Sequence, residues 1–179
     1  MLSRNDRSEK KSPAQKVAFS GLLVALALIF GYIESLVPLT IPVPGAKPGL
    51  ANLVTLTGLF FLDPFTVFIV LVTRIILSGF LFGNMYSIIY SLAGGVLSFA
   101  VMLPAKKSKR LSPVGVSMIG GVFHNIGQLT VAMFVVKSTV LIAYLPFLIL
   151  LGTAAGLLTG MICSAISSYL PVKNNNSTG

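Results

Sequence analysis

The sequence predicts an all-α integral membrane protein, a bundle of six transmembrane helices. Of its 179 residues, 55% are hydrophobic and only 9% are charged, whereas soluble domains carry about 25% charged residues. The apolar residues also gather into long runs, and a transmembrane helix needs about 20 of them in a row. The single cysteine, Cys163, excludes an intrachain disulfide and a cysteine metal cluster.

One membrane domain is predicted between two polar tails. Residues 1–13 and 172–179 are rich in charged and small polar residues, so we expect them to be disordered. Residues 14–171 form the six-helix domain. The first apolar run is longer than the core of a signal peptide, so we expect it to remain as the first helix.

Each predicted helix is an apolar run bounded by proline, glycine or charged residues. The six ranges are 14–37, 49–62, 64–82, 85–103, 114–136 and 139–170. The second helix is short and follows a stretch with Pro38, Pro42, Pro44 and Pro48, which favour an extended loop. Pro146 predicts a bend in the last helix.

The basic residues predict that both termini are cytoplasmic, because cytoplasmic loops accumulate Lys and Arg. Of the 13 Lys and Arg residues, this topology leaves only Lys47 and Lys137 outside and places Arg74 within a span. The net charge of +9 therefore reflects topology and attraction to anionic lipid. A nucleic-acid partner is not predicted, since the charges alternate with membrane spans. The protein is expected to be a multi-pass protein of the bacterial plasma membrane.

The stretch GAKPGLAN at the outer end of the second helix supplies the first candidate binding residues, Lys47 and Asn52. Lys47 also fits a lysine that extends to the membrane interface. Asn52 lies about one turn into the span, where its amide needs a partner, and a hydrogen bond between helices is the alternative.

Arg74 lies in the middle of the run FTVFIVLVTRIILSGFLF, far from either membrane surface. A charged residue at this depth marks a functional site unless it is paired. The structural alternative is an ion pair with Glu34 near the outer end of the first helix. Ser78 follows Arg74 by one turn, so the two share a helix face.

Two further helices carry polar faces. Spacings of three and four residues align small and polar positions in GNMYSIIYSLAGGVLS, of which the outer ones are binding candidates: Asn84, Ser87, Tyr90 and Ser91. An interfacial aromatic belt is the alternative for Tyr90. The stretch GGVFHNIGQ places three hydrogen-bonding side chains at mid-membrane: His124, Asn125 and Gln128. A lone histidine is a poor metal site. Three hydrogen-bonding side chains at this depth need partners, so a bound polar ligand is favoured over a bridge between helices.

Together these residues predict an outward-facing pocket. Two cations and several amides suit a small ligand that combines a phosphate or carboxylate with a flat or apolar surface. A polyprenyl synthase is not predicted, because such enzymes need aspartate-rich motifs and the four acidic residues here are scattered. An autonomous channel or secondary transporter is a third possibility, but the sequence has no carboxylate relay for proton coupling and no evident inverted repeat. No catalytic residue, metal or cofactor is predicted, and the protein is not expected to be an enzyme.

The motifs KPGLANLVTL, GNMYSIIYSLAGGVLS and GGVFHNIGQ, with the Arg74 helix, carry a family resemblance over residues 14–170. The chain resembles the Gx transporter, or heptaprenyl diphosphate synthase component I, family, whose members are similar to S components of energy-coupling factor (ECF) transporters. The resemblance implies an outer pocket capped by the loop between the first two helices. It also implies an ECF transmembrane coupling subunit, two ATPase subunits, and a flavin or an isoprenoid or quinone precursor as ligand. A membrane accessory role in polyprenyl diphosphate or menaquinone synthesis is the alternative.

An S component needs a surface that docks on the coupling subunit, which the resemblance assigns to small residues near the cytoplasmic end of the first helix. The stretch AQKVAFSGLLVA provides Ala14, Ala18, Gly21 and Ala25. Four-residue spacing of small side chains permits close helix approach. Packing within the bundle is the alternative for these residues.

Overall fold

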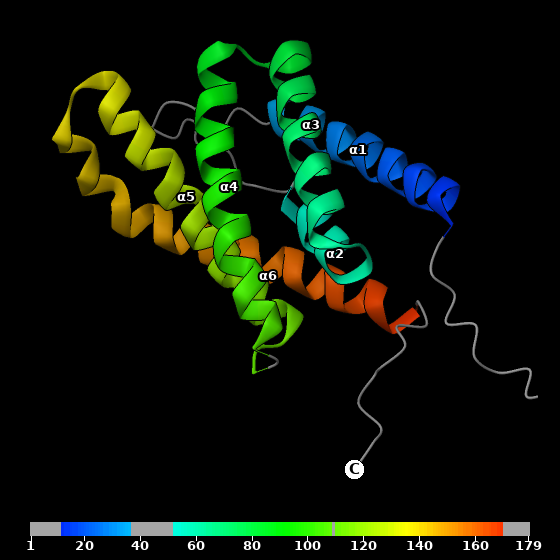
Figure 1. Cartoon of the computed structure of the whole chain (residues 1–179). Helices are drawn as coiled ribbons and strands as arrows, with labels where there is room; N and C mark the ends of the chain where they lie inside the picture. Colours follow the sequence, from blue (N-terminus) through cyan, green and yellow to red (C-terminus); the bar gives the residue numbers. More distant parts are fainter. Residues whose placement is uncertain (1–11, 37–51, 109, 170–179) are drawn as a thin grey trace, which may run out of the picture.

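The computed structural model describes residues 12–36, 52–108 and 110–169, and these residues are helical with short connections. The elements are α1 (Pro13–Leu36), α2 (Asn52–Phe61), α3 (Pro64–Phe82), α4 (Met85–Lys107), α5 (Pro113–Val136), the 3-10 helix η1 (Thr139–Tyr144) and α6 (Leu145–Tyr169) (Figure 1). The all-α prediction is confirmed for this part of the chain. Most of the predicted tails, and the proline-rich loop with Lys47, lie outside it.

Local sequence signals set the start of several helices. Asp63 and Asn84 precede α3 and α4, and their side chains accept hydrogen bonds from the backbone N–H groups of Thr66 and Ser87. Ser112 caps α5 in the same way, and prolines occupy the first turn of α3 and α5. A cap oxygen satisfies a backbone donor that has no partner within the helix. The observed starts therefore follow the predicted ones closely.

The second helix is shorter than a membrane span. With ten residues, α2 is about 15 Å long at 1.5 Å per residue, half of the roughly 30 Å hydrocarbon core. Five other segments are long and apolar enough to cross a membrane, so five of the six predicted membrane helices are confirmed as candidate spans, and the second is short, as predicted. All side chains from Asn52 to Leu59 are buried. The half-length helix α2 therefore fills the interior, in contact with α1, α3, α4 and α6.

The fourth helix continues beyond its predicted end at residue 103. It passes through Pro104 and ends at Lys107. The Nζ atom of Lys106 donates to the carbonyl of Leu59 at the end of α2 and lies 5.2 Å from the centroid of the Phe60 ring. These two contacts between α4 and α2 stabilise the extra turn, which the local sequence did not predict.

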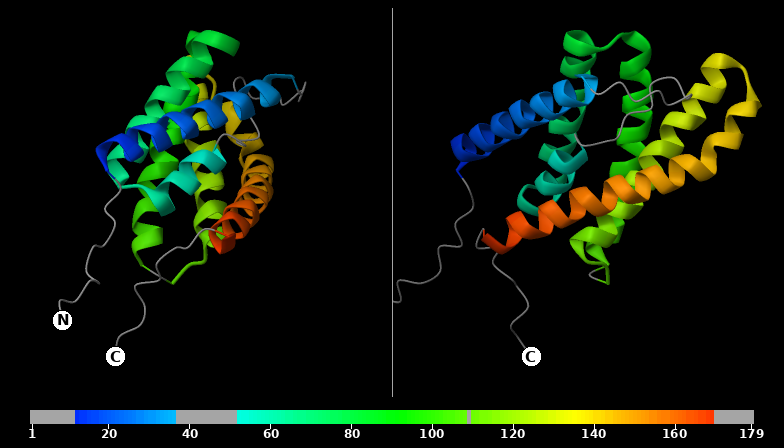
Figure 2. Two further views of the ribbon diagram at one scale, coloured as in Figure 1. Left: turned by 90° about the vertical axis from the view of Figure 1, so that its right-hand side faces the viewer. Right: turned by 180° about the vertical axis from the view of Figure 1, so that it is seen from behind.

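Consecutive helices lie side by side from α3 to α6, and α1 packs on α3 (Figures 1 and 2). A close backbone contact joins α5 and α6, where a Cβ atom added to Gly121 would lie 2.2 Å from the carbonyl oxygen of Gly152. Gly156 and Gly160 also meet the α5 backbone. The glycines of α6 therefore serve close packing. The bend predicted near Pro146 takes the form of η1 running into α6.

Two contacts define one end of the bundle. Lys16 at the start of α1 pairs with Asp63 before α3, and Lys106 at the end of α4 reaches the end of α2. We call this end of the bundle, which carries Lys16, Lys106, Lys107 and Arg110, the basic end. The end of α1, the α3–α4 turn and η1 lie at the opposite end (Figure 2). The cytoplasmic location of the basic end stays a prediction.

Candidate functional site

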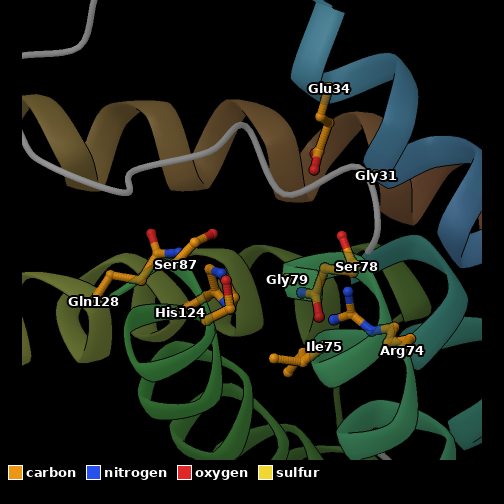
Figure 3. A pocket seen from close by; sticks show the side chains of 11 residues that line it. Gly31, Glu34, Arg74, Ile75, Ser78, Gly79, Ser87, His124 and Gln128 are labelled. Carbon is orange, nitrogen blue, oxygen red and sulfur yellow. The ribbon is translucent and has the colours of Figure 1, made fainter. Parts of the chain in front are cut away.

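A cavity of about 40 Å³ lies in the half of the bundle away from the basic end. Helices α1 to α5 all contribute to its wall (Figure 3). The lining residues are Gly31, Glu34, Asn52, Arg74, Ile75, Ser78, Gly79, Ser87, Ser91, His124 and Gln128. Eight of these eleven residues have polar side chains that can form hydrogen bonds.

Several buried polar atoms of this wall have no hydrogen-bond partner within the described residues. They are Oδ1 of Asn52, Nε of Arg74, Nδ1 of His124 and both amide atoms of Gln128. Leaving one such group unpaired costs about 1–3 kcal/mol. Four side chains from three helices that converge without partners are therefore poor structural elements. They are well suited to a polar molecule held between them.

Opposite charges face each other across the cavity. The carboxylate side chain of Glu34 extends from α1 toward Ser78, and the guanidinium group of Arg74 lies beside Ser78 on α3 (Figure 3). Glu34 and Arg74 are both only 7% exposed, and their charges attract. The ion-pair alternative for Arg74 and the binding hypothesis therefore describe the same place in the molecule.

The structure brings most of the predicted site residues into this one cavity. Those that line it are Asn52, Arg74, Ser78, Ser87, Ser91, His124 and Gln128. Helical spacing accounts for their shared direction within each helix, and packing of the helices brings the faces together. Lys47 lies outside the described residues, so its place in the pocket stays a prediction.

Three predicted site residues lie elsewhere. Asn84 caps α4 through its side-chain oxygen. Tyr90 is buried against a hydrophobic cluster that includes Leu129 and Leu148. Asn125 points toward α6, where its Nδ2 atom donates to the carbonyl of Leu148 at 2.7 Å. Each of these side chains has a structural contact that accounts for its position.

A second, much smaller hollow of about 10 Å³ lies between α5 and α6 and is lined by Asn125 and Thr159, among others. A space of this size holds about one water molecule. Asn52 and His124 line both spaces. The two spaces are therefore adjacent, and both have polar side chains in their walls.

The sequence prediction missed four lining residues, Gly31, Glu34, Ile75 and Gly79. A signal for two of them is present in α1, where the buried positions Leu23, Ala27, Gly31 and Glu34 recur every three or four residues. An acidic residue on the buried face of an apolar helix marks a polar interior. Among the described residues, no group of three or more His, Cys, Asp or Glu side chains could hold a metal ion.

The small residues of α1 lie on the outer surface. Ala14, Ala18, Gly21 and Ala25 are all exposed, and a Cβ atom added to Gly21 would meet nothing within 4 Å. Beside Gly21, a groove of about 540 Å³ runs between α1 and α3. Within the described part of the chain, this face of α1 is therefore not covered by another helix.

Comparison with known proteins places the site within a family. No curated protein matches the chain, and no solved structure matches it. Residues 23–166 match the family model described as heptaprenyl diphosphate synthase component I. The matched range begins within α1 and ends within α6, so it contains every residue that lines the main cavity. The chain belongs to the heptaprenyl diphosphate synthase component I family.

Proposed function

We propose that this chain is the substrate-binding S component of an ECF-type ABC transporter. Its ligand would be a small anionic molecule with an aromatic or apolar part, from the flavin or isoprenoid and quinone-precursor classes. The observation that supports this function is the cavity, in which polar side chains from five helices converge within an apolar bundle. The protein would bind its ligand without converting it.

The cavity chemistry supports an anionic head group. Arg74 offers charged donors, while Asn52, His124 and Gln128 offer unpaired polar atoms. Sites for whole small molecules measure about 300–1,000 Å³, whereas this cavity measures about 40 Å³. The head of the ligand would therefore occupy the cavity, and its apolar part would extend beyond it.

The two ends of the bundle suit the two tasks of an S component. We place the basic end in the cytoplasm, where Lys and Arg accumulate in membrane proteins. The cavity then lies in the outer half, and the exposed small residues of α1 lie toward the cytoplasm. The transmembrane coupling subunit would dock there and would carry the two ATPase subunits.

A second candidate function is favoured by the name of the family, heptaprenyl diphosphate synthase component I. In that case the chain would be a membrane accessory component of polyprenyl diphosphate or menaquinone synthesis. The same cavity would hold a prenyl precursor for a partner enzyme. The two functions differ in the proteins that associate with the chain.

The test is purification of the tagged chain from its native membrane in mild detergent, followed by mass spectrometry of retained proteins and small molecules. We expect a coupling subunit, two ATPases and a flavin, a naphthoate or a prenyl compound. Retention of a prenyl synthase subunit in place of the ATPases would support the second candidate. Polyprenyl synthase activity of the isolated chain would overturn the binding-only role.

A further inference from the structure

The charge pair on the cavity wall is held by close packing of α1 on α3. A Cβ atom added to Gly31 would lie only 3.0 Å from Oγ of Ser78, so the two helices touch at this level. Glu34 follows Gly31 by one turn on the same buried face of α1. The glutamate is therefore fixed above Arg74 and Ser78, as Figure 3 shows.

The other lining side chains add little charge. His124 of α5 is the remaining titratable group on the described wall, while α2 and α4 contribute the neutral side chains of Asn52, Ser87 and Ser91. With a neutral imidazole, the charges of the described wall cancel, since one carboxylate faces one guanidinium. A cavity built only to attract negative charge would not bury a carboxylate in its wall.

We propose that Glu34 is a specificity-determining residue of this site, which selects a head group with a single negative charge over a polyanion such as a diphosphate. The inference rests on the proposed function and names the charge of its ligand. A carboxylate head could pair with Arg74 while a neighbouring hydroxyl or amine donates to Glu34. The additional charges of a diphosphate would meet Glu34 where few water molecules screen them. Such repulsive elements are a general means of excluding wrong ligands.

The experiment compares two probes that share one tail, farnesoic acid and farnesyl diphosphate. Their affinities for the full chain in lipid nanodiscs are measured by titration calorimetry. We expect the wild type to prefer the carboxylic acid. Glu34→Gln should reduce this preference by about tenfold, the effect of roughly 1.4 kcal/mol of lost repulsion, mainly through tighter binding of the diphosphate. Ser35→Ala is the matched control, because the hydroxyl of this exposed neighbour donates to the carbonyl of Tyr32, and it should leave the ratio unchanged.

A second variant covers the case in which Glu34→Gln does not fold. Ser78→Asp adds a carboxylate to the same cavity and should widen the preference for the carboxylic acid. An unchanged ratio in the folded variants, or a wild type that prefers the diphosphate, would overturn the role of Glu34 while leaving a binding site in place. Binding of neither probe to the wild type would remove isoprenoids from the proposed ligand class and would overturn the role of Glu34 in selecting between their head groups.

Discussion

The Nζ atom of Lys16 lies 3.2 Å from Oδ1 of Asp63, so an ion pair joins the start of α1 to the start of α3. The other carboxylate oxygen of Asp63 accepts hydrogen bonds from the backbone N–H of Thr66 at 3.0 Å and from its hydroxyl at 2.8 Å. One side chain thus caps α3 and fixes α1 beside it. Both contacts favour the ionised form of Asp63.

Acid should weaken the basic end through Asp63. The backbone N–H of Thr66, then its hydroxyl and Lys16, lower the pKa of Asp63 from 3.8 to about 2. A carboxyl group with a lowered pKa in the folded state contributes stability above its unfolded pKa, and this stability is lost as the pH falls through the folded value. We expect the thermal unfolding midpoint of the protein to decrease as the pH is lowered from 3.8 to about 2.

The effect should be small, because the side chain of Asp63 is 41% exposed and water screens its charge. Asp63→Asn keeps an oxygen that can cap α3 but does not titrate, so it should lose this part of the pH dependence. Lys16→Ala should reduce this pH dependence less than Asp63→Asn does, since Thr66 lowers the pKa of Asp63 more than Lys16 does. A midpoint that falls equally in wild type and Asp63→Asn would assign the acid effect to other groups.

Two glycine-to-alanine changes should differ sharply in stability. A Cβ atom at Gly121 would lie 2.2 Å from the carbonyl oxygen of Gly152, whereas one at Gly21 would meet nothing within 4 Å. Because backbone cannot move aside cheaply, Gly121→Ala should cost about 1–3 kcal/mol by overpacking. Gly21→Ala should be neutral or slightly stabilising, as alanine favours a helix. Unfolding of both variants in one detergent gives the comparison, and equal midpoints would contradict the close α5–α6 contact.

A bulky residue at position 21 should weaken assembly without disturbing the chain itself. Gly21→Leu fits the open surface of α1, so folding and ligand binding should stay unchanged. Copurification of the coupling subunit should fall several-fold, since close helix approach needs small residues. Leu22→Phe is the control, because Leu22 is exposed and points about 100° away from Gly21 on the helix. Undiminished copurification of the Gly21→Leu variant would exclude this face as the docking surface.

The fold could be predicted from the sequence where local signals decide it. Proline and capping residues fixed the starts of α3 and α5, and apolar length identified the long helices. The end of α4 could not be predicted, because it depends on the contact of Lys106 with the end of α2. The burial of α2 could not be predicted, since a buried half-helix is as apolar as a spanning one.

For the site, the depth of Arg74 and His124 in apolar runs was sufficient to select them, because a polar group there needs a partner. The direction of neighbouring side chains was not predictable. Adjacent helical residues point about 100° apart, so His124 faces the cavity while Asn125 faces α6. Which of the two faces the cavity depends on how α5 is oriented between α4 and α6. The sequence pattern of one helix does not give this orientation. The same reason explains why Glu34 was not recognised as part of the wall.

Removal of the Arg74 guanidinium should weaken ligand binding more than folding. Arg74→Ala takes away the charged donor of the cavity, and a hydrogen bond to a charged group contributes about 1.5–3 kcal/mol. We expect affinity for the copurified ligand to fall about ten- to a hundredfold. Thr73→Ala is the matched control, because Thr73 lines the groove on the α1 side of α3 instead of the cavity. An unchanged affinity in folded Arg74→Ala would mean that the arginine is structural.

Gln128 distinguishes a binding role from a structural one most directly. Both of its side-chain amide atoms are buried without a hydrogen-bond partner among the described residues, and the side chain is 2% exposed. Such an amide costs stability in the ligand-free protein. Gln128→Leu replaces it with an apolar side chain of similar size, so the thermal midpoint of the ligand-free protein should stay the same or rise.

Ligand affinity should move in the opposite direction in this variant. The leucine cannot donate to or accept from a polar head group, so we expect affinity to fall about tenfold, as for the loss of one or two neutral hydrogen bonds. Thermal unfolding with and without the copurified ligand measures both effects in one experiment. A lower midpoint without ligand would show that Gln128 stabilises the bundle. A ligand-induced increase as large as that of the wild type would show that Gln128 does not contact the ligand.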